Sequence, residues 1–250
     1  MTEVCRVFSN LIKEAKIIAI SNIIKKSKEK RVLSIHQLVD GIAEKKTEPC
    51  LLESPLLAMI GVKIKNKDYS IMVFRKQVCY VPVKTELCFD QIICDDCWLT
   101  RQEQAELFGN LFAMRKSNVP ILTRDLALIL AEQTSHHTLW INPKYIANLS
   151  KEGIQLFDLP EYHLAVRCTK HKLEKYGRLA YSGQAMIKRD LDPDNLYQTS
   201  NGYAEFLHIP RTYFNNAVLQ NLERQSFYLQ RGKFIKEIAK LPRFDFARNA

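Results

Sequence analysis

Glycine is scarce in this chain, at 8 of 250 residues, and no two glycines form a G-x-G pattern. A loop that cradles a phosphate needs closely spaced glycines, because its backbone must approach the phosphate. The nucleophile-elbow pattern G-x-S-x-G and the zinc-protease pattern H-E-x-x-H are also missing from the sequence. We therefore expect that the protein is not an enzyme and that it uses no cofactor.

Long apolar runs are missing as well. No stretch approaches the roughly 18 consecutive apolar residues of a membrane-spanning helix. Near the N-terminus, Arg6, Lys13, Glu14 and Lys16 interrupt the apolar residues, so no signal-peptide core of adequate length remains. The seven cysteines are an odd number for a disulfide framework. We expect a cytoplasmic protein with reduced thiols and without a membrane partner.

Acidic residues are outnumbered, with 27 Asp and Glu against 37 Lys and Arg, which gives a net charge of +10. Basic side chains that neutralise phosphates release condensed counterions, so an excess of this size favours a polyanionic partner. The alternative is a basic surface without a ligand. Residues 206–250 hold eight Lys or Arg and three Glu or Asp, so the excess is dense at this end of the chain.

The spacing of apolar residues predicts an α+β fold. Helical spacing predicts helices over 4–27, 35–46, 101–116, 124–133 and around 171–177. Thr100 with Glu103 forms a capping-box pattern ahead of the third helix, and Thr123 is the expected cap of the fourth. Alternating or β-rich stretches predict strands over 60–66, 68–74, 77–84, 138–143 and 163–168, with a turn at 66–68.

Acidic and turn-forming residues cluster over 190–202, in the string DLDPDNLYQTSNG. This composition predicts a boundary between an α+β region at 1–195 and a small C-terminal unit at 203–250. Asp190, Asp192 and Asp194 imitate the start of a calcium loop. Asn195 and Asn201 stand where such a loop needs glycine and glutamate, so we predict a linker rather than a metal site.

Within the C-terminal unit, alternation over 206–209 predicts a short strand with Leu207 and Ile209 on one face. Pro210 ends this strand and suits the first turn of a helix. Two stretches with helical apolar spacing follow within 214–241. A strand and two helices in fewer than about 40 residues bury little apolar surface alone, which favours a homodimer.

This order of elements resembles the ribbon-helix-helix DNA-binding family. The resemblance lies in the H-I-P end of the strand, the helix over 211–224 and the string R-G-K-F-I-K-E-I-A at 231–239. The last string is similar to the family's Arg-Ser-x-Leu-Ile-x-x-Ala pattern, and the whole covers about one sixth of the chain. The resemblance implies that strands from two subunits pair and enter the major groove of double-stranded DNA.

The resemblance also implies site residues of two kinds. Groove-facing residues on the strand would read bases, and the start of the second helix would grip a phosphate through backbone N–H groups. The implied DNA-binding residues are Phe206, His208, Arg211, Gln230, Arg231 and Lys233, with Ala204 on the groove-facing side of the strand. Phe206 departs from the pattern, because the family usually places Arg, Lys, Asn or Gln there.

A second interpretation of the same residues stays open. Residues 203–225 also resemble a helix-turn-helix, with Ala204 in its first helix, Ile209 and Pro210 in its turn, and 227–235 as a wing. Both interpretations predict a sequence-specific DNA-binding regulator of transcription, which also contacts RNA polymerase or a co-regulator through its large N-terminal region. The alternative from another class is an assembly or adaptor protein whose basic C-terminus binds a protein partner.

Four residues could in principle hold zinc. Cys94 and Cys97 form C-x2-C, and Cys168 and His171 form C-x2-H, so each pair could supply two of four tetrahedral ligands. The two pairs are about 70 residues apart in the sequence, which makes the pattern weak. We expect buried, reduced cysteines and no metal.

Overall fold

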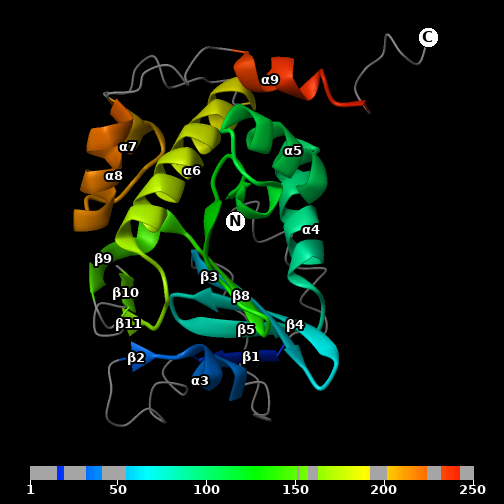
Figure 1. Ribbon diagram of the computed structural model, residues 1–250, viewed down its shortest axis with the longest axis vertical. Helices are drawn as coiled ribbons and strands as arrows, with labels where there is room; N and C mark the ends of the chain where they lie inside the picture. The colour runs from blue at the N-terminus through cyan, green and yellow to red at the C-terminus, as the bar shows by residue number, and fades with distance from the viewer. Residues whose placement is uncertain are drawn as a thin grey trace.

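The protein, in a computed structural model, is α+β. The structure describes residues 16–19, 32–40, 55–150, 153–156, 163–191, 202–223 and 232–242. Figure 1 shows helix α6 running across the molecule, with α7 and α8 on one side of it and α4 and α5 on the other. The predicted fold class is confirmed. None of the helices described is long and apolar enough to cross a membrane.

The main sheet has seven strands in the order β1-β5-β4-β3-β8-β7-β6, and every neighbouring pair is antiparallel. A second sheet has the order β2-β11-β10-β9. The strands are β1 Lys16–Ala19, β2 Val32–Leu33, β3 Leu56–Ile64, β4 Lys67–Phe74, β5 Gln77–Val81, β6 Ile121–Leu122, β7 Ala127–Gln133, β8 His137–Ile141, β9 Ile146–Ser150, β10 Gly153–Leu156 and β11 His163–Leu164.

The helices are α3 Ile35–Asp40, α4 Thr85–Cys97, α5 Arg101–Leu111, α6 Lys170–Leu191, α7 Tyr203–Phe206, α8 Tyr213–Glu223 and α9 Lys233–Ile238, with short 3-10 turns η3 Lys116–Asn118 and η4 Pro143–Tyr145. The predicted capping box before α5 is confirmed. The Thr100 hydroxyl accepts from the Glu103 N–H at 3.2 Å, and the Glu103 carboxylate accepts from the Thr100 N–H at 2.8 Å. This reciprocal pair satisfies two N–H groups that a helix start leaves open.

The predicted hairpin between β3 and β4 is confirmed, with its turn one residue earlier than expected. Ile64 pairs with Lys67, so the loop consists of Lys65 and Asn66 alone. Both loop residues have left-handed φ values, 48° and 63°. A two-residue turn of this kind matches the right-handed twist of the strands, which is why hairpins use it.

Two predicted helices are wrong where the structure describes them. Ala127–Gln133 is strand β7 rather than a helix, and the Thr123 hydroxyl accepts from the Leu126 N–H at 2.9 Å to form the turn before it. Residues 127–131 are buried, and a continuous apolar run does not distinguish a buried strand from a helix. Lys16–Ala19 is strand β1, which pairs with β5 and lies inside the helix predicted over 4–27.

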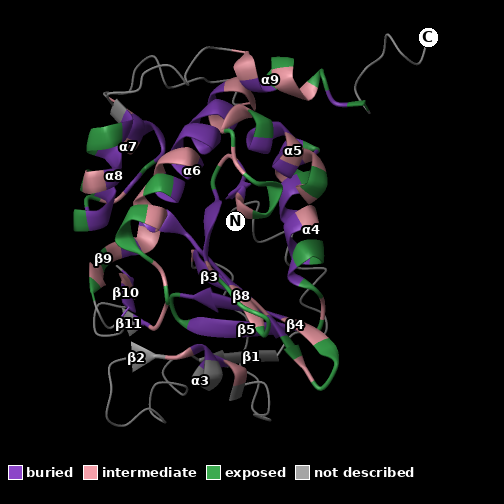
Figure 2. Ribbon diagram, viewed as in Figure 1, coloured by how far each residue is buried: buried purple, intermediate pink, exposed green. Residues whose placement is uncertain are grey.

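Helix α6 joins the sheet to the C-terminal elements. It packs against β7, α7, α8 and α9, and buried residues follow much of its length in Figure 2. Helix α6 also packs against β6, and Gly183 permits this, because a Cβ there would lie 2.4 Å from the Leu122 Cδ1. Buried residues from the sheet, from α8 and from α9 belong to one hydrophobic core. The boundary predicted at 190–202 falls largely on residues outside those described.

Candidate nucleic-acid interface

The strand predicted over 206–209 is wrong, because α7 covers Tyr203–Phe206 and a helical turn follows. The Leu207 N–H donates to the Tyr203 carbonyl at 2.9 Å. Tyr203, Phe206 and Leu207 are spaced as one face of a helix, and all three are buried. Leu207 and Ile209, on which the predicted alternation rested, are both buried in this structure too, so a pattern of four residues allowed either structure.

A turn connects α7 to α8. His208 has a φ of 52°, in the left-handed region that ends helices, and the Ile209 N–H donates to the Ala204 carbonyl at 2.8 Å. The segment is therefore a helix, a turn and a helix, as in the second interpretation of the sequence. The wing of that interpretation does not form as expected, since Lys233–Ile238 is helix α9 and 224–231 lie outside the described residues.

Buried hydrogen bonds hold the start of α8 against the body of the protein. The Asn215 amide donates to the carbonyls of Lys144 and Pro210, at 3.0 and 2.9 Å. Its oxygen accepts from the Tyr181 hydroxyl of α6 at 2.7 Å. Asn215 and Tyr181 are both fully buried. A side chain that satisfies three buried partners fixes the position of the helix that carries it.

The turn itself is held in the same way. The Lys144 ammonium donates to the Leu207 carbonyl at 2.7 Å, and the Thr212 hydroxyl donates to the Ile146 carbonyl at 2.7 Å. Lys144 is buried, and this burial lowers its pKa to about 8; the nearby Asp125 opposes the shift. The α7–α8 unit is thus anchored to η4, β9 and α6, and α8 has a rigid support.

The outer face of α8 presents uncharged polar groups. Tyr213 is 66% exposed, and Asn216 and Gln220 are exposed at helical spacing from it. Asn and Gln amides offer a donor beside an acceptor, which matches the N6 and N7 edge of adenine in the major groove. We call Tyr213, Asn216 and Gln220 the α8 face.

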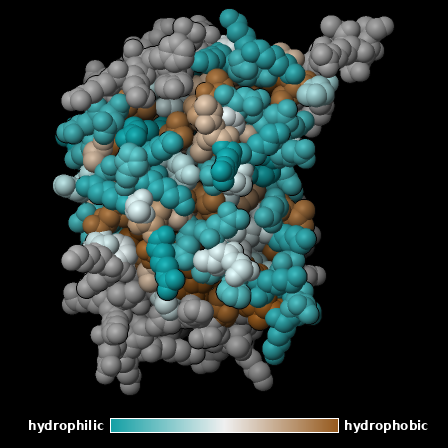
Figure 3. Space-filling model, viewed as in Figure 1, coloured by the Kyte–Doolittle hydropathy of each residue, from teal (hydrophilic) through white to brown (hydrophobic). Residues whose placement is uncertain are grey.

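The N-terminal half of α6 is strongly basic. Residues 167–178 contain five Lys or Arg and one His against a single Glu. We call Arg167, Lys170, His171, Lys175 and Arg178 the basic α6 face; Arg178 is half-exposed and the others are exposed. Lys172 is half-exposed too, but its ammonium donates to the Ala131 carbonyl of β7. Figure 3 shows mostly hydrophilic side chains over the region of α6 and α8. Phosphate groups are the partners that such a surface attracts.

One contact joins the two faces. The Lys170 ammonium lies 5.0 Å from the centre of the Tyr213 ring, within the range of a cation–π interaction. Lys170 also lies 3.7 Å from Glu174, one turn further along α6. The beginning of α6 therefore lies beside the beginning of α8, and the basic surface borders the α8 face.

The residues implied by the family resemblance are found in different places. Phe206 is only 3% exposed, with the Lys188 ammonium 5.5 Å from its ring, so its predicted groove-facing position is wrong. His208 and Arg211 are exposed in the turn that leads into α8, and their contact with DNA stays a prediction. Gln230 and Arg231 lie outside the described residues.

At the start of α9, where a phosphate was predicted to bind, a carboxylate of the protein is bound instead. The Gly232 and Phe234 N–H groups donate to the Asp190 carboxylate, at 2.9 and 2.8 Å. Lys233 is the first residue of α9 and is half-buried. The N–H groups expected to meet a phosphate are thus bound to a side chain of α6, and this part of the prediction is wrong.

No residue of the α8 face was predicted from the sequence, and of the basic α6 face only His171 was named, as a possible metal ligand. A signal was present in the run 167–178, where basic residues lie around Tyr176. This run precedes residue 206, where the dense basic region of the sequence was expected to begin. Helices α6 and α8 lie side by side only in the tertiary structure, so neither segment alone predicts this contact.

The four candidate zinc ligands do not form a site. Cys97 is buried, Cys94 three residues before it is exposed, and nowhere in the described ranges do three His, Cys, Asp or Glu residues gather to hold a metal ion. Burial, reinforced by the adjacent Asp96 charge, raises the pKa of the Cys97 thiol, so this cysteine stays protonated at neutral pH.

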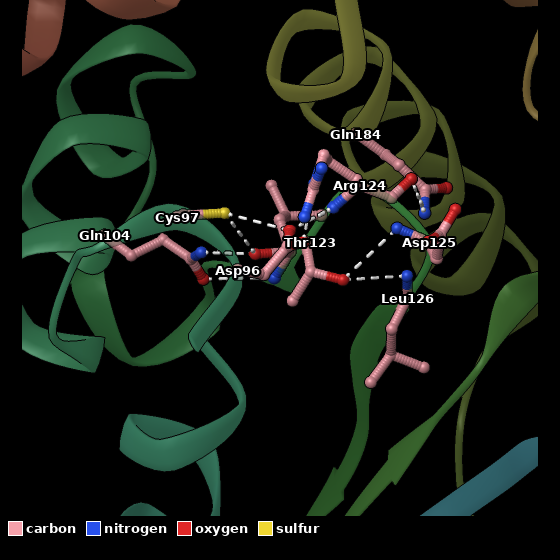
Figure 4. Close-up of polar contacts among 9 residues, drawn as sticks. Asp96, Cys97, Gln104, Thr123, Arg124, Asp125, Leu126 and Gln184 are labelled. Carbon is pink, nitrogen blue, oxygen red and sulfur yellow. Dashed lines mark hydrogen bonds and ion pairs between the residues drawn. The ribbon is translucent and has the colours of Figure 1, made fainter. Parts of the chain in front are cut away.

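Asp96 belongs instead to a network that fixes the turn between β6 and β7 (Figure 4). Its carboxylate accepts from the Arg124 guanidinium at 2.7 Å. Gln104 donates to the Leu122 carbonyl at 2.6 Å and accepts from the Leu122 N–H at 3.1 Å. Gln184 of α6 donates to the Arg124 carbonyl at 3.2 Å. The network holds α4, α5 and α6 around one turn, which indicates a structural role.

Comparison of the chain with protein-family models, with curated proteins and with solved structures finds no match.

Proposed function

We propose that the protein binds double-stranded DNA through the α8 face and the basic α6 face, as a sequence-specific regulator of transcription. The observation that supports this most is the contact of Lys170 with Tyr213, which places a dense basic surface beside an exposed helix with Asn and Gln side chains. The two faces have the two chemistries that sequence-specific DNA binding needs. Cations position the protein on phosphates, and amides read base edges.

The proposal needs a helix in the groove rather than a ribbon. An α-helix fits the major groove, and α8 is an exposed helix that buried hydrogen bonds hold in place. His208 and Arg211 lie in the turn before α8, where they would contact the DNA backbone. Leu207 and Ile209, which a ribbon would share between two subunits, are buried within one chain. A homodimer on a two-fold site remains compatible with this face but is not needed to complete it.

We expect two kinds of variant to behave differently. Replacing Gln220 or Asn216 by alanine should weaken binding to the preferred duplex by about 1–3 kcal/mol and leave scrambled duplexes nearly unchanged. Replacing Lys175 by alanine should weaken binding to both duplexes and lower the slope of log affinity against log salt by about one unit. Fluorescence anisotropy with a duplex selected from a random library, measured at several salt concentrations, reports both quantities.

Lys67→Ala is the matched control for Lys175→Ala. Lys67 is also exposed, but it lies in the β3–β4 hairpin, away from α8 (Figure 1). Lys67→Ala should change the affinity for DNA and the salt slope less than Lys175→Ala does. If Gln220, Asn216 and Lys175 variants all bind both duplexes like the parent protein, this surface is not the DNA interface. The adaptor alternative would then take its place.

A further inference from the structure

Helix α4 differs from the rest of this basic protein in its charge. Its sequence, TELCFDQIICDDC, contains four acidic residues and no Lys or Arg, within a chain of net charge +10. Two of the four acids have partners within the protein, since Asp96 pairs with the Arg124 guanidinium and Asp90 accepts a hydrogen bond from the backbone N–H of Arg101. Glu86 and Asp95 are exposed at the two ends of the helix. The exposed side of α4 is therefore acidic.

The same helix exposes apolar side chains in one line. Leu87, Gln91, Cys94 and Trp98 are all exposed and follow one another at steps of three or four residues. Leu87 is 55% exposed and Trp98 is 65% exposed, which makes them two of the four large apolar side chains exposed in the described part of the chain. We call these four residues the α4 stripe. It is about 16 Å long, at 1.5 Å per residue.

Gln91 is the one polar amide in the stripe, but its polar group is already hydrogen-bonded within α4. Its amide donates to both oxygens of the Asp95 carboxylate, at 3.0 and 3.1 Å. The polar end of the side chain is thus directed along the acidic edge of the helix, toward Asp95. The stripe has Leu87 and Trp98 at its ends and a thiol near its middle, with an acidic border.

Trp98 has a left-handed backbone conformation, which is unfavourable for a bulky residue. It follows the last residue of α4 with a φ of 57°, and its N–H donates to the Cys94 carbonyl at 3.0 Å. Left-handed positions at helix ends favour glycine, because a Cβ is strained there. A bulky side chain in such a conformation is an outlier from which a function can be inferred. A large indole ring thus stands in this conformation at the end of the stripe and is 65% exposed.

We propose that the α4 stripe is a docking site for a basic, apolar helical segment of another protein. Apolar residues of the segment would cover Leu87 and Trp98, and its Lys or Arg residues would meet Glu86 and Asp95. Charge complementarity selects this occupant: the acidic border repels DNA and favours a cationic partner. Helix α4 and helix α8 lie on opposite sides of α6 in Figure 1, so we expect that the two surfaces do not compete. This inference does not depend on the proposed DNA binding.

The test uses the full chain and a fluorescently labelled amphipathic helix of about 18 leucine and lysine residues as the probe. A peptide of the same pattern with glutamate in place of lysine is its control. We expect the lysine peptide to bind and the glutamate peptide not to bind. Because the protein itself is basic, a non-specific preference would run the other way. Binding should also protect the exposed Trp98, and not the buried Trp140, from quenching by acrylamide.

Trp98→Gly separates docking from stability. Glycine suits the left-handed position, so this variant should melt at the same temperature as the parent protein or higher. It should nevertheless bind the lysine peptide more than about tenfold more weakly, as expected for the loss of a large aromatic side chain from the interface. Leu87→Ser should weaken binding in the same direction. Neither variant should alter binding to DNA.

Three results would overturn the proposal. The first is equal binding of both peptides, and the second is parent-like binding by Trp98→Gly. The third is concentration-dependent dimerisation of the parent protein that Trp98→Gly abolishes, because the stripe would then face a second copy of this chain. A failure of DNA binding in every variant and in the parent protein would leave this proposal standing and would reject only the proposed function.

Discussion

Replacing Asn215 by alanine is expected to lower the free energy of unfolding by about 3 kcal/mol. The change removes three hydrogen bonds at once and leaves the Tyr181 hydroxyl and the Lys144 carbonyl without this partner. Each buried polar group that loses its partner costs about 1–3 kcal/mol. The Pro210 carbonyl is less affected, because it still accepts from the Thr212 N–H at 3.0 Å. Urea denaturation followed by circular dichroism measures the loss.

The neighbouring Asn216 supplies a matched control of the same residue type. It is exposed, so Asn216→Ala should change the unfolding free energy by no more than about 0.5 kcal/mol. Tyr181→Phe adds a second check. Since the two side chains share a hydrogen bond, the double variant with Asn215→Ala should cost less than the sum of the single variants. Additive effects would show that the bond contributes nothing to stability.

The second large effect is expected from pH. The pKa of Lys144 is about 8 in the folded protein, lowered by burial, against an ordinary value of 10.5. Between these values the unfolded chain holds the proton and the folded protein does not, so stability from this group rises with pH. Each unit of pKa corresponds to about 1.4 kcal/mol, which makes the whole gain about 3 kcal/mol.

Other buried groups act in the opposite direction over part of this range. Burial raises the pKa of the Cys97 thiol and of the Tyr181 hydroxyl, so both stay protonated in the folded protein while the unfolded chain releases their protons. Their contribution to stability is lost as pH rises past the unfolded pKa values. The pH dependence of the unfolding free energy of the parent protein alone therefore contains contributions of both signs.

Lys144→Met isolates the lysine, because the opposing groups are the same in both proteins. The unfolding free energy of the parent protein, minus that of the variant, should rise by about 3 kcal/mol between pH 7.5 and pH 10.5. Chemical denaturation at four or five pH values across this range gives the difference directly. A difference that stays flat would mean that Lys144 keeps its ordinary pKa and that burial does not act on it.

The sequence predicted those parts of the fold that depend on neighbouring residues. The β3–β4 hairpin follows from alternation and from a polar turn at Asn66, and the start of α5 follows from Thr100 and Glu103. Both signals act within a few residues and do not need the rest of the protein. Strand β7 was missed for the opposite reason. It is buried at nearly every position from Ala127 to Ala131, so only its neighbours β6 and β8 decide that it is extended.

The basic charge of the proposed interface was visible in the sequence, but the place of the interface was not. The excess of Lys and Arg favoured a polyanionic partner, and His208 and Arg211, two residues of the predicted interface, are exposed near α8; their contact with DNA stays a prediction. The alternation at 206–209 was too short to separate a strand from one turn of helix. Nor does the sequence show that Asp190, in a segment predicted to be a linker, would occupy the start of α9. Long-range pairings of this kind depend on the packed structure.

The position of α6 limits which fragment of this protein would keep α8 in its place. The apolar side chains of α8, with Phe214, Val218 and Leu222 among them, are covered by α6 and β9 rather than by one another. A fragment cut at residue 202 would expose that whole surface and lose the anchor at Lys144. A fragment that is meant to keep the α7–α8 unit folded would need to run from η4 onward, with α6 included. The same holds for any transfer of this unit into another protein, because the long helix α6 covers the apolar side of α8.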